Sequence, residues 1–159
     1  AKEVARLLGE PAEVVQSVLM VKQPASLVQF DFHTDGIYIQ SEPDTLVVTW
    51  LPLDPCNREN GTIRFLPGSH AQPPNTQPRC DAGDAVEVEP GDVVLWGGDL
   101  WHGSEPNRST RRRCGLTLRY MPPDVHTREA EHAHGYLCRG EDESGYWISW
   151  PVPEGNSIP

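Results

Sequence analysis

Short runs of β-forming residues, separated by strong turn signals, limit the folds open to this chain more than any other feature of its sequence. Eight runs predict strands, over residues 13–21, 26–33, 36–40, 45–53, 62–66, 85–89, 93–96 and 115–121. Turn formers such as Asn60-Gly61 and Pro67-Gly68 stand between them. Because no long helical pattern intervenes, we expect an all-β-dominated chain whose strands pair antiparallel in a sandwich or barrel.

The two ends of the chain differ from this pattern. Helically spaced Val and Leu side chains predict a short helix over residues 1–9, which a Gly-Glu-Pro segment ends. The tail beyond Pro122 is polar and predicts loops or a partial cover. At 159 residues and without an internal repeat, residues 1–159 are expected to form a single domain. The chain starts in an amphipathic segment without an initiator Met, so we allow for a missing N-terminal part or missing loops.

The charge of the chain excludes two classes of partner. A formal net charge of −10 argues against binding to nucleic acid or anionic lipid, because both require a basic face. Arg111-Arg112-Arg113 is the densest basic run and is too short to change that balance. No apolar run is long enough to cross a membrane, and the N-terminus has no signal-peptide pattern, so we expect a cytoplasmic protein.

The cysteines do not suggest a zinc or redox site. The four residues are Cys56, Cys80, Cys114 and Cys138, and no two of them form a CxxC pair. We therefore expect reduced thiols on small, buried side chains.

The segment from Phe32 to Gly36 carries the strongest chemical signal. Alternate side chains of a strand share a face, so His33 and Asp35 are expected to point at one ion from the same side of a sheet. His102 follows the strand predicted over residues 93–96 and can supply a third ligand from a neighbouring strand. Two histidines and one carboxylate on one face of an octahedron suit Fe(II), because the remaining positions stay open for co-substrate and O₂.

The other histidines are interpreted as surface or hydrogen-bonded side chains. His70 lies in a Pro-Gly-Ser-His turn, and His126, His132 and His134 lie in the polar tail. The tail shows no strand that would fix His132 and His134 around a metal. A lone His-x-Asp triplet is also a weak signal, so the metal prediction depends on His102 being nearby.

A basic side chain accompanies the predicted metal site. We expect a hairpin to return the chain from His102 to Arg113, which then faces the same cavity. The planar guanidinium of Arg113 can hold a carboxylate through two hydrogen bonds, and Ser104 is close enough in sequence to donate a third. Arg111 and Arg112 are interpreted as solvated charges.

Taken together, six pieces of sequence resemble the phytanoyl-CoA dioxygenase family of Fe(II)/2-oxoglutarate oxygenases. They occur in the family's order and cover most of residues 14–121. The pieces are His33-Thr34-Asp35-Gly36, Thr49-Trp50-Leu51-Pro52-Leu53-Asp54, Glu59-Asn60-Gly61-Thr62, Pro67-Gly68-Ser69-His70, Pro90-Gly91-Asp92-Val93-Val94, and His102-Gly103-Ser104 followed by Asn107, Ser109 and Arg113. The resemblance implies a double-stranded β-helix, a jelly-roll barrel with iron in its mouth, in which His33, Asp35 and His102 are the iron ligands.

The resemblance also implies how the co-substrate is held. Arg113 and Ser104 match the family's clamp on the distal carboxylate of 2-oxoglutarate, and Trp50 matches a position in the co-substrate pocket. Lys22 resembles a family lysine, and the sequence assigns it no role. The expected cofactors are Fe(II), 2-oxoglutarate and O₂, with ascorbate supporting activity.

We therefore expect a dioxygenase that hydroxylates an unactivated C–H bond of a small molecule and releases succinate and CO₂. Asp35 is a carboxylate where related halogenases have a small residue, which favours hydroxylation over halogenation. Two alternatives remain open. One is a cupin-like barrel that binds Mn or Zn as an isomerase or carbohydrate-binding module, although cupins usually have more histidines in their first motif. The other is an inactive relative that keeps the fold for partner binding.

Overall fold

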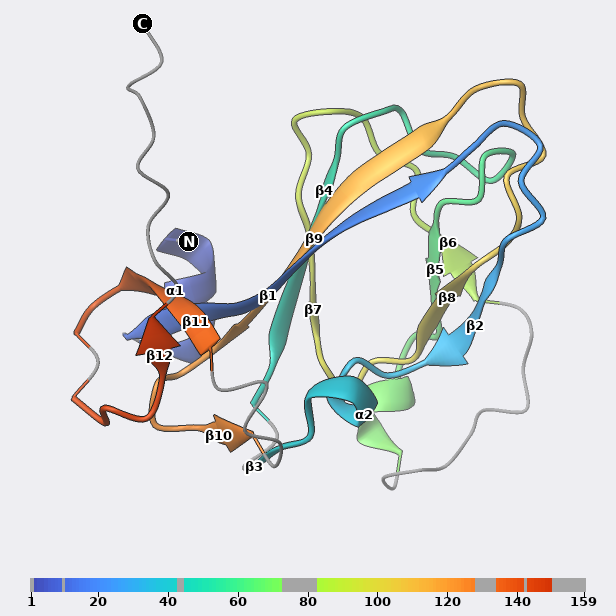
Figure 1. Ribbon diagram of the computed structural model, residues 1–159. Coiled ribbons are helices and arrows are strands. Elements are labelled where there is room, and N and C mark those ends of the chain that lie inside the picture. Colours follow the sequence, from blue (N-terminus) through green and yellow to red (C-terminus); the bar gives the residue numbers. More distant parts are fainter. Residues whose placement is uncertain are drawn as a thin grey trace, which may run out of the picture.

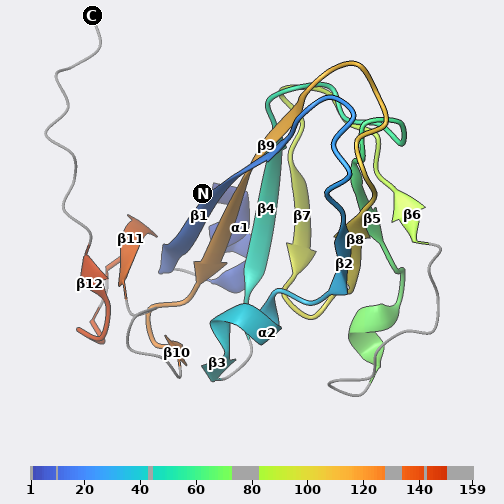
Figure 2. The ribbon, with the colours of Figure 1, turned by 45° about the vertical axis from the view of Figure 1, so that its right-hand side comes forward.

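Two facing sheets, antiparallel apart from one pair of strands, form the body of the molecule in the computed structural model (Figures 1 and 2). The structure describes residues 2–9, 11–42, 45–72, 83–127, 134–141 and 143–149. The larger sheet has the strand order β12-β11-β1-β9-β4-β7. Its strands are β1 (Ala12–Lys22), β4 (Val47–Pro52), β7 (Val94–Gly97), β9 (Arg113–Met121), β11 (His134–Arg139) and β12 (Ile148–Ser149).

The smaller sheet has the order β2-β8-β5-β6 and faces the larger one. Its strands are β2 (Phe30–His33), β5 (Ile63–Phe65), β6 (Asp84–Ala85) and β8 (His102–Ser104). The remaining described elements are α1 (Lys2–Leu8), α2 (Gly36–Ile39), the 3₁₀ turn η1 (Ser69–Ala71), and the two-stranded pair β3 (Ser41–Glu42) and β10 (His126–Thr127). The all-β character and the N-terminal helix are as the sequence predicts.

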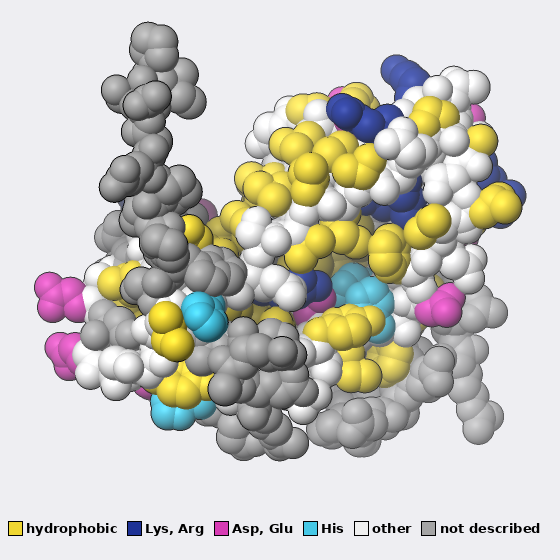
Figure 3. Space-filling view, viewed as in Figure 1, with side chains coloured by type: hydrophobic (Ala, Val, Ile, Leu, Met, Phe, Trp, Pro, Cys, Tyr) yellow, Lys and Arg dark blue, Asp and Glu magenta, His cyan; other side chains and the backbone are white. Residues whose placement is uncertain are grey.

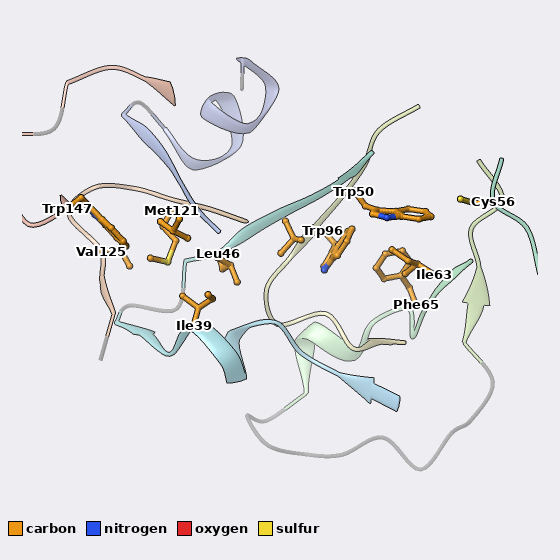
Figure 4. Close-up of a cluster of buried hydrophobic side chains, with 12 residues drawn as sticks. Ile39, Leu46, Trp50, Cys56, Ile63, Phe65, Trp96, Met121, Val125 and Trp147 are labelled. Atoms are coloured by element: carbon orange, nitrogen blue, oxygen red, sulfur yellow. The ribbon is translucent and has the colours of Figure 1, made fainter. Parts of the chain in front are cut away.

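The hydrophobic core lies between the sheets. Val48 and Trp50 on β4 are fully buried, and Trp96 on β7 packs edge-on against Phe65 from the opposite sheet, with ring centroids 5.2 Å apart. Figure 4 shows this cluster continuing past Ile39 towards the far end of the barrel. Packing of these buried aromatic rings fixes the distance between the two sheets. The functional side chains lie in the space between them.

The segment over residues 36–40, predicted as a strand, is instead the short helix α2. Its β-branched residues suggested a strand, but the order of exposure rules one out: Ile37 and Tyr38 are exposed and Ile39 is buried. Strand alternation would place positions 37 and 39 on one face, whereas a single helical turn buries only position 39. Packing of Ile39 into the core has therefore overridden local propensity.

The tail and two other segments also differ from the prediction. Beyond Pro122 the chain forms β10, β11 and β12, and β11 extends the larger sheet by pairing with the start of β1. Strand pairing between residues so distant in sequence leaves little local signal. Residues 26–29 form no strand, and of residues 85–89 only the first belongs to one, β6.

The described cysteines carry free thiols, as expected. Cys56 and Cys114 are buried, whereas Cys138 is exposed, contrary to prediction, because it lies on β11 at the periphery of the larger sheet. Cys80 lies outside the described residues. None of the helices in the described part of the chain has the length and apolar character needed to span a membrane.

Candidate metal centre

The ligand atoms of His33, Asp35 and His102 all lie within 4.8 Å of one another. His33 ends β2 and lies opposite His102, the first residue of β8, in the antiparallel ladder between these strands. The sequence suggested that Asp35 lies on the same strand as His33, but it does not. It is the N-cap residue of α2, and the turn that begins there directs its carboxylate back towards the two rings. No other such group of potential ligands occurs among the described residues.

Both imidazole rings are held with one nitrogen directed at the centre. Nδ1 of His33 lies 2.7 Å from the carbonyl oxygen of Asp31, and Nδ1 of His102 lies 2.9 Å from that of Leu100. A carbonyl oxygen only accepts, so each Nδ1 carries the hydrogen and each Nε2 keeps its lone pair. Burial lowers the pKa of His102 below its usual value, although the nearby Asp35 carboxylate acts in the opposite direction. The lowered pKa keeps the ring in its neutral, metal-binding form.

The Asp35 carboxylate has no exposure to solvent and is held by two other side chains. Its Oδ1 accepts hydrogen bonds from Nε of Arg119, at 3.0 Å, and from Nη2 of the same guanidinium. Its Oδ2 accepts a hydrogen bond from Nε1 of Trp96 at 3.1 Å and lies 3.4 Å from Nε2 of His102. Neither Arg119 nor Trp96 is predicted from the sequence, although strand alternation from Arg113 places Arg119 on the same face of β9.

A cavity of about 190 Å³ lies beside this centre, between the two sheets. Figure 3 shows histidine side chains in a hollow that is bordered by hydrophobic ones. Five of the six residues singled out in the sequence line the cavity, and the sixth, Asp35, is buried beside His102. The five are His33, Trp50, His102, Ser104 and Arg113.

Arg113 reaches this cavity by a different route from the one predicted. It begins β9 in the larger sheet, whereas His102 begins β8 in the smaller sheet, so the connection crosses between sheets and is not a hairpin. The Arg113 guanidinium is buried, and Nη2 donates to the carbonyl oxygen of Gly61 at 2.7 Å. Nε has no partner among the described residues.

Trp50 lies next to this guanidinium, with the Arg113 carbon Cζ 5.5 Å from the centroid of its ring. A Cβ atom on Gly115 would lie 2.2 Å from Nε1 of Trp50, so the indole needs a glycine at this point of β9. Nε1 of Trp50 is buried and has no described partner. Unpaired buried donors are costly, so this end of the cavity suits an anionic, oxygen-rich ligand such as a dicarboxylate.

Lys22 is a second cation close to this end of the cavity, although it does not line it. It lies opposite Arg113 in the pairing of β1 with β9, is 2% exposed, and donates from Nζ to Oγ of Ser104 at 2.8 Å. Burial, followed by the positive charge of Arg113, lowers the pKa of Lys22 to about 7. Because Ser104 accepts from Lys22, its own hydroxyl hydrogen remains available for a ligand.

The histidines set aside in the sequence lie outside the centre. His70 is on η1, and His126 stacks on Tyr146 with ring centroids 4.0 Å apart. His134 begins β11, so the tail does contain a strand, contrary to the expectation. His132 lies outside the described residues. Arg112 is exposed, as expected, and its guanidinium pairs with Asp54.

Known proteins that are similar to this chain include phytanoyl-CoA dioxygenase relatives and solved non-heme enzymes. The family model described as phytanoyl-CoA dioxygenase matches residues 1–115. A phytanoyl-CoA dioxygenase domain-containing protein 1 homolog of Dictyostelium discoideum is 31% identical over 117 residues, which are 60% of this chain and 42% of that protein. Phytanoyl-CoA dioxygenase 1 of Oryza sativa subsp. japonica is 30% identical over 121 residues, covering 66% of this chain and 43% of that protein. The chain thus spans less than half the length of these two relatives.

Solved structures share the fold. The nickel complex of the non-heme monooxygenase ThoJ is 25% identical, with a TM-score of 0.83 over 97% of this chain and 61% of that one. The epimerase SnoN in complex with Fe³⁺, alpha ketoglutarate and nogalamycin RO is 20% identical, with a TM-score of 0.69 over 79% of this chain and 56% of that one. These similarities confirm the double-stranded β-helix expected from the sequence.

Proposed function

Because this chain belongs to the phytanoyl-CoA dioxygenase family, we propose that it is a non-haem Fe(II) oxygenase that uses 2-oxoglutarate as co-substrate. The observation that carries this proposal is the convergence of His33, Asp35 and His102 beside a cavity with a basic end. Two neutral imidazoles and one carboxylate are the ligand set that suits Fe(II) with open positions. The presence of Fe³⁺ and alpha ketoglutarate in the SnoN complex supports the same pair of cofactors here.

We assign the three ligands to iron and the basic end to 2-oxoglutarate. Arg113 and Ser104 would hold the distal carboxylate, because Nε of the buried guanidinium has no described partner and the Ser104 hydroxyl hydrogen remains available. Lys22, whose ammonium donates to Oγ of Ser104 and to the carbonyl oxygens of Ser104 and Glu105, would add a positive charge next to that hydroxyl. Trp50 would lie along the co-substrate. When bound, iron with 2-oxoglutarate and O₂ supplies the oxidising power, and succinate and CO₂ are released.

The rest of the cavity supports a substrate with an unactivated C–H bond. Val18 and Met20 on β1, with Phe30 and Tyr38 across the opening, line the cavity with apolar groups. Asp35 is the only carboxylate at the described centre, and it is paired with Arg119, so no acid there would attract a cationic substrate. The role of these walls is to exclude water and to place one carbon of a small molecule near the metal.

Hydroxylation is the reaction we propose, although this fold supports others: SnoN is described as an epimerase and SnoK as a carbocyclase. The Asp35 carboxylate occupies the position at which the related halogenases have a small residue, which leaves halogenation without room for a halide. Once a screen for stimulated succinate release has found a substrate, the product formed under ¹⁸O₂ decides between outcomes. A hydroxylase incorporates one ¹⁸O atom, whereas an epimerase or carbocyclase incorporates none.

The oxygenase proposal is tested before any substrate is known. Fe(II) and 2-oxoglutarate, added anaerobically, should give the visible charge-transfer band of a chelated keto acid, and His102→Ala should abolish it. With O₂ and ascorbate, 2-oxoglutarate should be converted to succinate. A wild-type protein that binds Fe(II) but shows neither band nor turnover would favour a cupin-like metal protein instead.

A further inference from the structure

Arg119 touches the candidate metal centre without being one of its ligands. It lies on β9 opposite Gln16 of β1, and its side chain points between the sheets, where it lines the cavity. Nε and Nη2 both donate to Oδ1 of Asp35, and Nη1 donates to Oε1 of Gln16. One guanidinium therefore links β9, β1 and the N-terminus of α2.

The two oxygens of Asp35 differ sharply in their surroundings. Oδ1 takes both hydrogen bonds from Arg119, while Oδ2 takes the one from Trp96 and lies 3.4 Å from Nε2 of His102. Oδ2 is thus the oxygen that lies beside His102, while Oδ1 is turned to Arg119. Rotating the carboxylate to offer both oxygens would break the bonds to Arg119 inside a site with no solvent to replace them.

We infer that Arg119 is a positioning residue that makes Asp35 a one-oxygen metal ligand. This inference rests on the proposed function. In an octahedral site, one-oxygen binding leaves three positions free, whereas two-oxygen binding would leave only two and crowd out either the keto acid or O₂. Arg119 is also the positive charge that compensates the buried Asp35 carboxylate before metal binds, so the site is formed in advance.

The arginine fork is needed for this role because two of its N–H groups reach the same oxygen. A lysine could neutralise Asp35 with a single ammonium, but it could not also hold Gln16 in the same plane. Gln16 in turn fixes the guanidinium, since its amide oxygen accepts from Nη1. Arg119→Lys should therefore keep part of the function, and Gln16→Leu should weaken it less than Arg119→Met does.

The test uses Co(II) as the metal, because its visible spectrum responds to the identity and geometry of its ligands. Metal affinity is measured by calorimetry, and folding by thermal unfolding of the metal-free protein. Arg112→Met is the matched control: Arg112 also holds a carboxylate, that of Asp54, through Nε at 2.9 Å and Nη2 at 3.1 Å, but does so at the surface.

We expect Arg119→Met to weaken Co(II) binding by about 10- to 100-fold, the range found for lost partners of metal ligands, and to change its visible bands, because the second oxygen of Asp35 would then replace a water ligand. Arg119→Lys should fall between it and wild type, and Arg112→Met should match wild type in affinity and spectrum. If Arg119→Met does not fold, Gln16→Leu should show a smaller change in the same bands.

Wild-type affinity and an unchanged Co(II) spectrum in Arg119→Met, or in Gln16→Leu where the first variant does not fold, would overturn the inference. If the proposed function is wrong, the result is different: wild-type protein would bind Co(II) but not 2-oxoglutarate. The Co(II) affinity and spectrum of the Arg119 variants would then still test whether Arg119 positions Asp35. Wild-type protein that binds no metal would overturn both.

Discussion

His33 and His102 face one another across the β2–β8 ladder, and the same local contact orients each ring. The ring centroids are 4.4 Å apart, and each Nδ1 bonds to the carbonyl oxygen two residues earlier in the chain. The backbone that pairs the strands therefore also fixes the tautomer of both rings. This arrangement explains how a site with two short strands can hold two ligands rigidly.

The first prediction concerns these rings. His33→Ala and His102→Ala should each weaken Co(II) or Fe(II) binding by at least about 100-fold, since even a lost partner of a ligand costs 10- to 100-fold. Calorimetry measures the effect. His70→Ala, on η1 and away from the centre, is the control and should bind like wild type. Unchanged affinity in either ligand variant would remove that histidine from the site.

The second prediction separates co-substrate binding from metal binding. Arg113→Leu should raise the Kd for 2-oxoglutarate by about 10- to 100-fold, because a hydrogen bond to a charged group contributes about 1.5–3 kcal/mol. Co(II) affinity should not change. Arg113→Lys should recover only part of the loss, since an ammonium lacks the planar fork. Equal losses of metal and 2-oxoglutarate affinity would show that Arg113 acts on the whole fold and not on the carboxylate.

These residues show what the sequence could and could not predict. The triad and Arg113 belong to short motifs whose residue types already restrict the chemistry, and runs of β-forming residues located most strands of both sheets. Arg119 and Trp96 act through Asp35, which is 84 and 61 residues away, and Lys22 acts through Ser104, 82 residues away. Such partners depend on strand register, which local patterns do not determine. Residues 36–40 were predicted as a strand from the β-propensity of their isoleucines, but burial of Ile39 in the core favours the helical turn α2.

The third prediction is a pH dependence that originates at Lys22. Burial lowers the pKa of Lys22 to about 7, so the amine loses its proton as the pH rises above 7 in the ligand-free protein. A bound dicarboxylate favours the protonated amine and raises its pKa. Binding above pH 7 must therefore take up a proton, and affinity for 2-oxoglutarate should fall as pH rises, by up to about tenfold per pH unit.

The sequence makes this titration easy to observe, because Lys2 and Lys22 are its only lysines. In protein labelled with ¹³C at the lysine Cε, one signal should titrate near pH 7 and move to higher pH with 2-oxoglutarate, while exposed Lys2 serves as the reference. Lys22→Met should bind more weakly at pH 6.5 and lose the pH dependence. A Lys22 signal that titrates above pH 10 would contradict the prediction.

The fourth prediction uses the two faces of β1 to test the apolar wall. Met20 lines the cavity, whereas its neighbour Leu19 is 58% exposed on the outer face of the same strand. With any substrate that stimulates succinate release, Met20→Ser should lower kcat/KM by about tenfold or more, since apolar contacts in a pocket contribute about 1–3 kcal/mol to discrimination. The charge-transfer band with Fe(II) and 2-oxoglutarate should persist, because Met20 is neither a metal ligand nor part of the basic end.

Leu19→Ser makes the same chemical change on the outer face and should leave kcat/KM unaltered. If both variants lost activity equally, the loss would reflect the stability of β1, and the substrate would have to be placed elsewhere in the cavity.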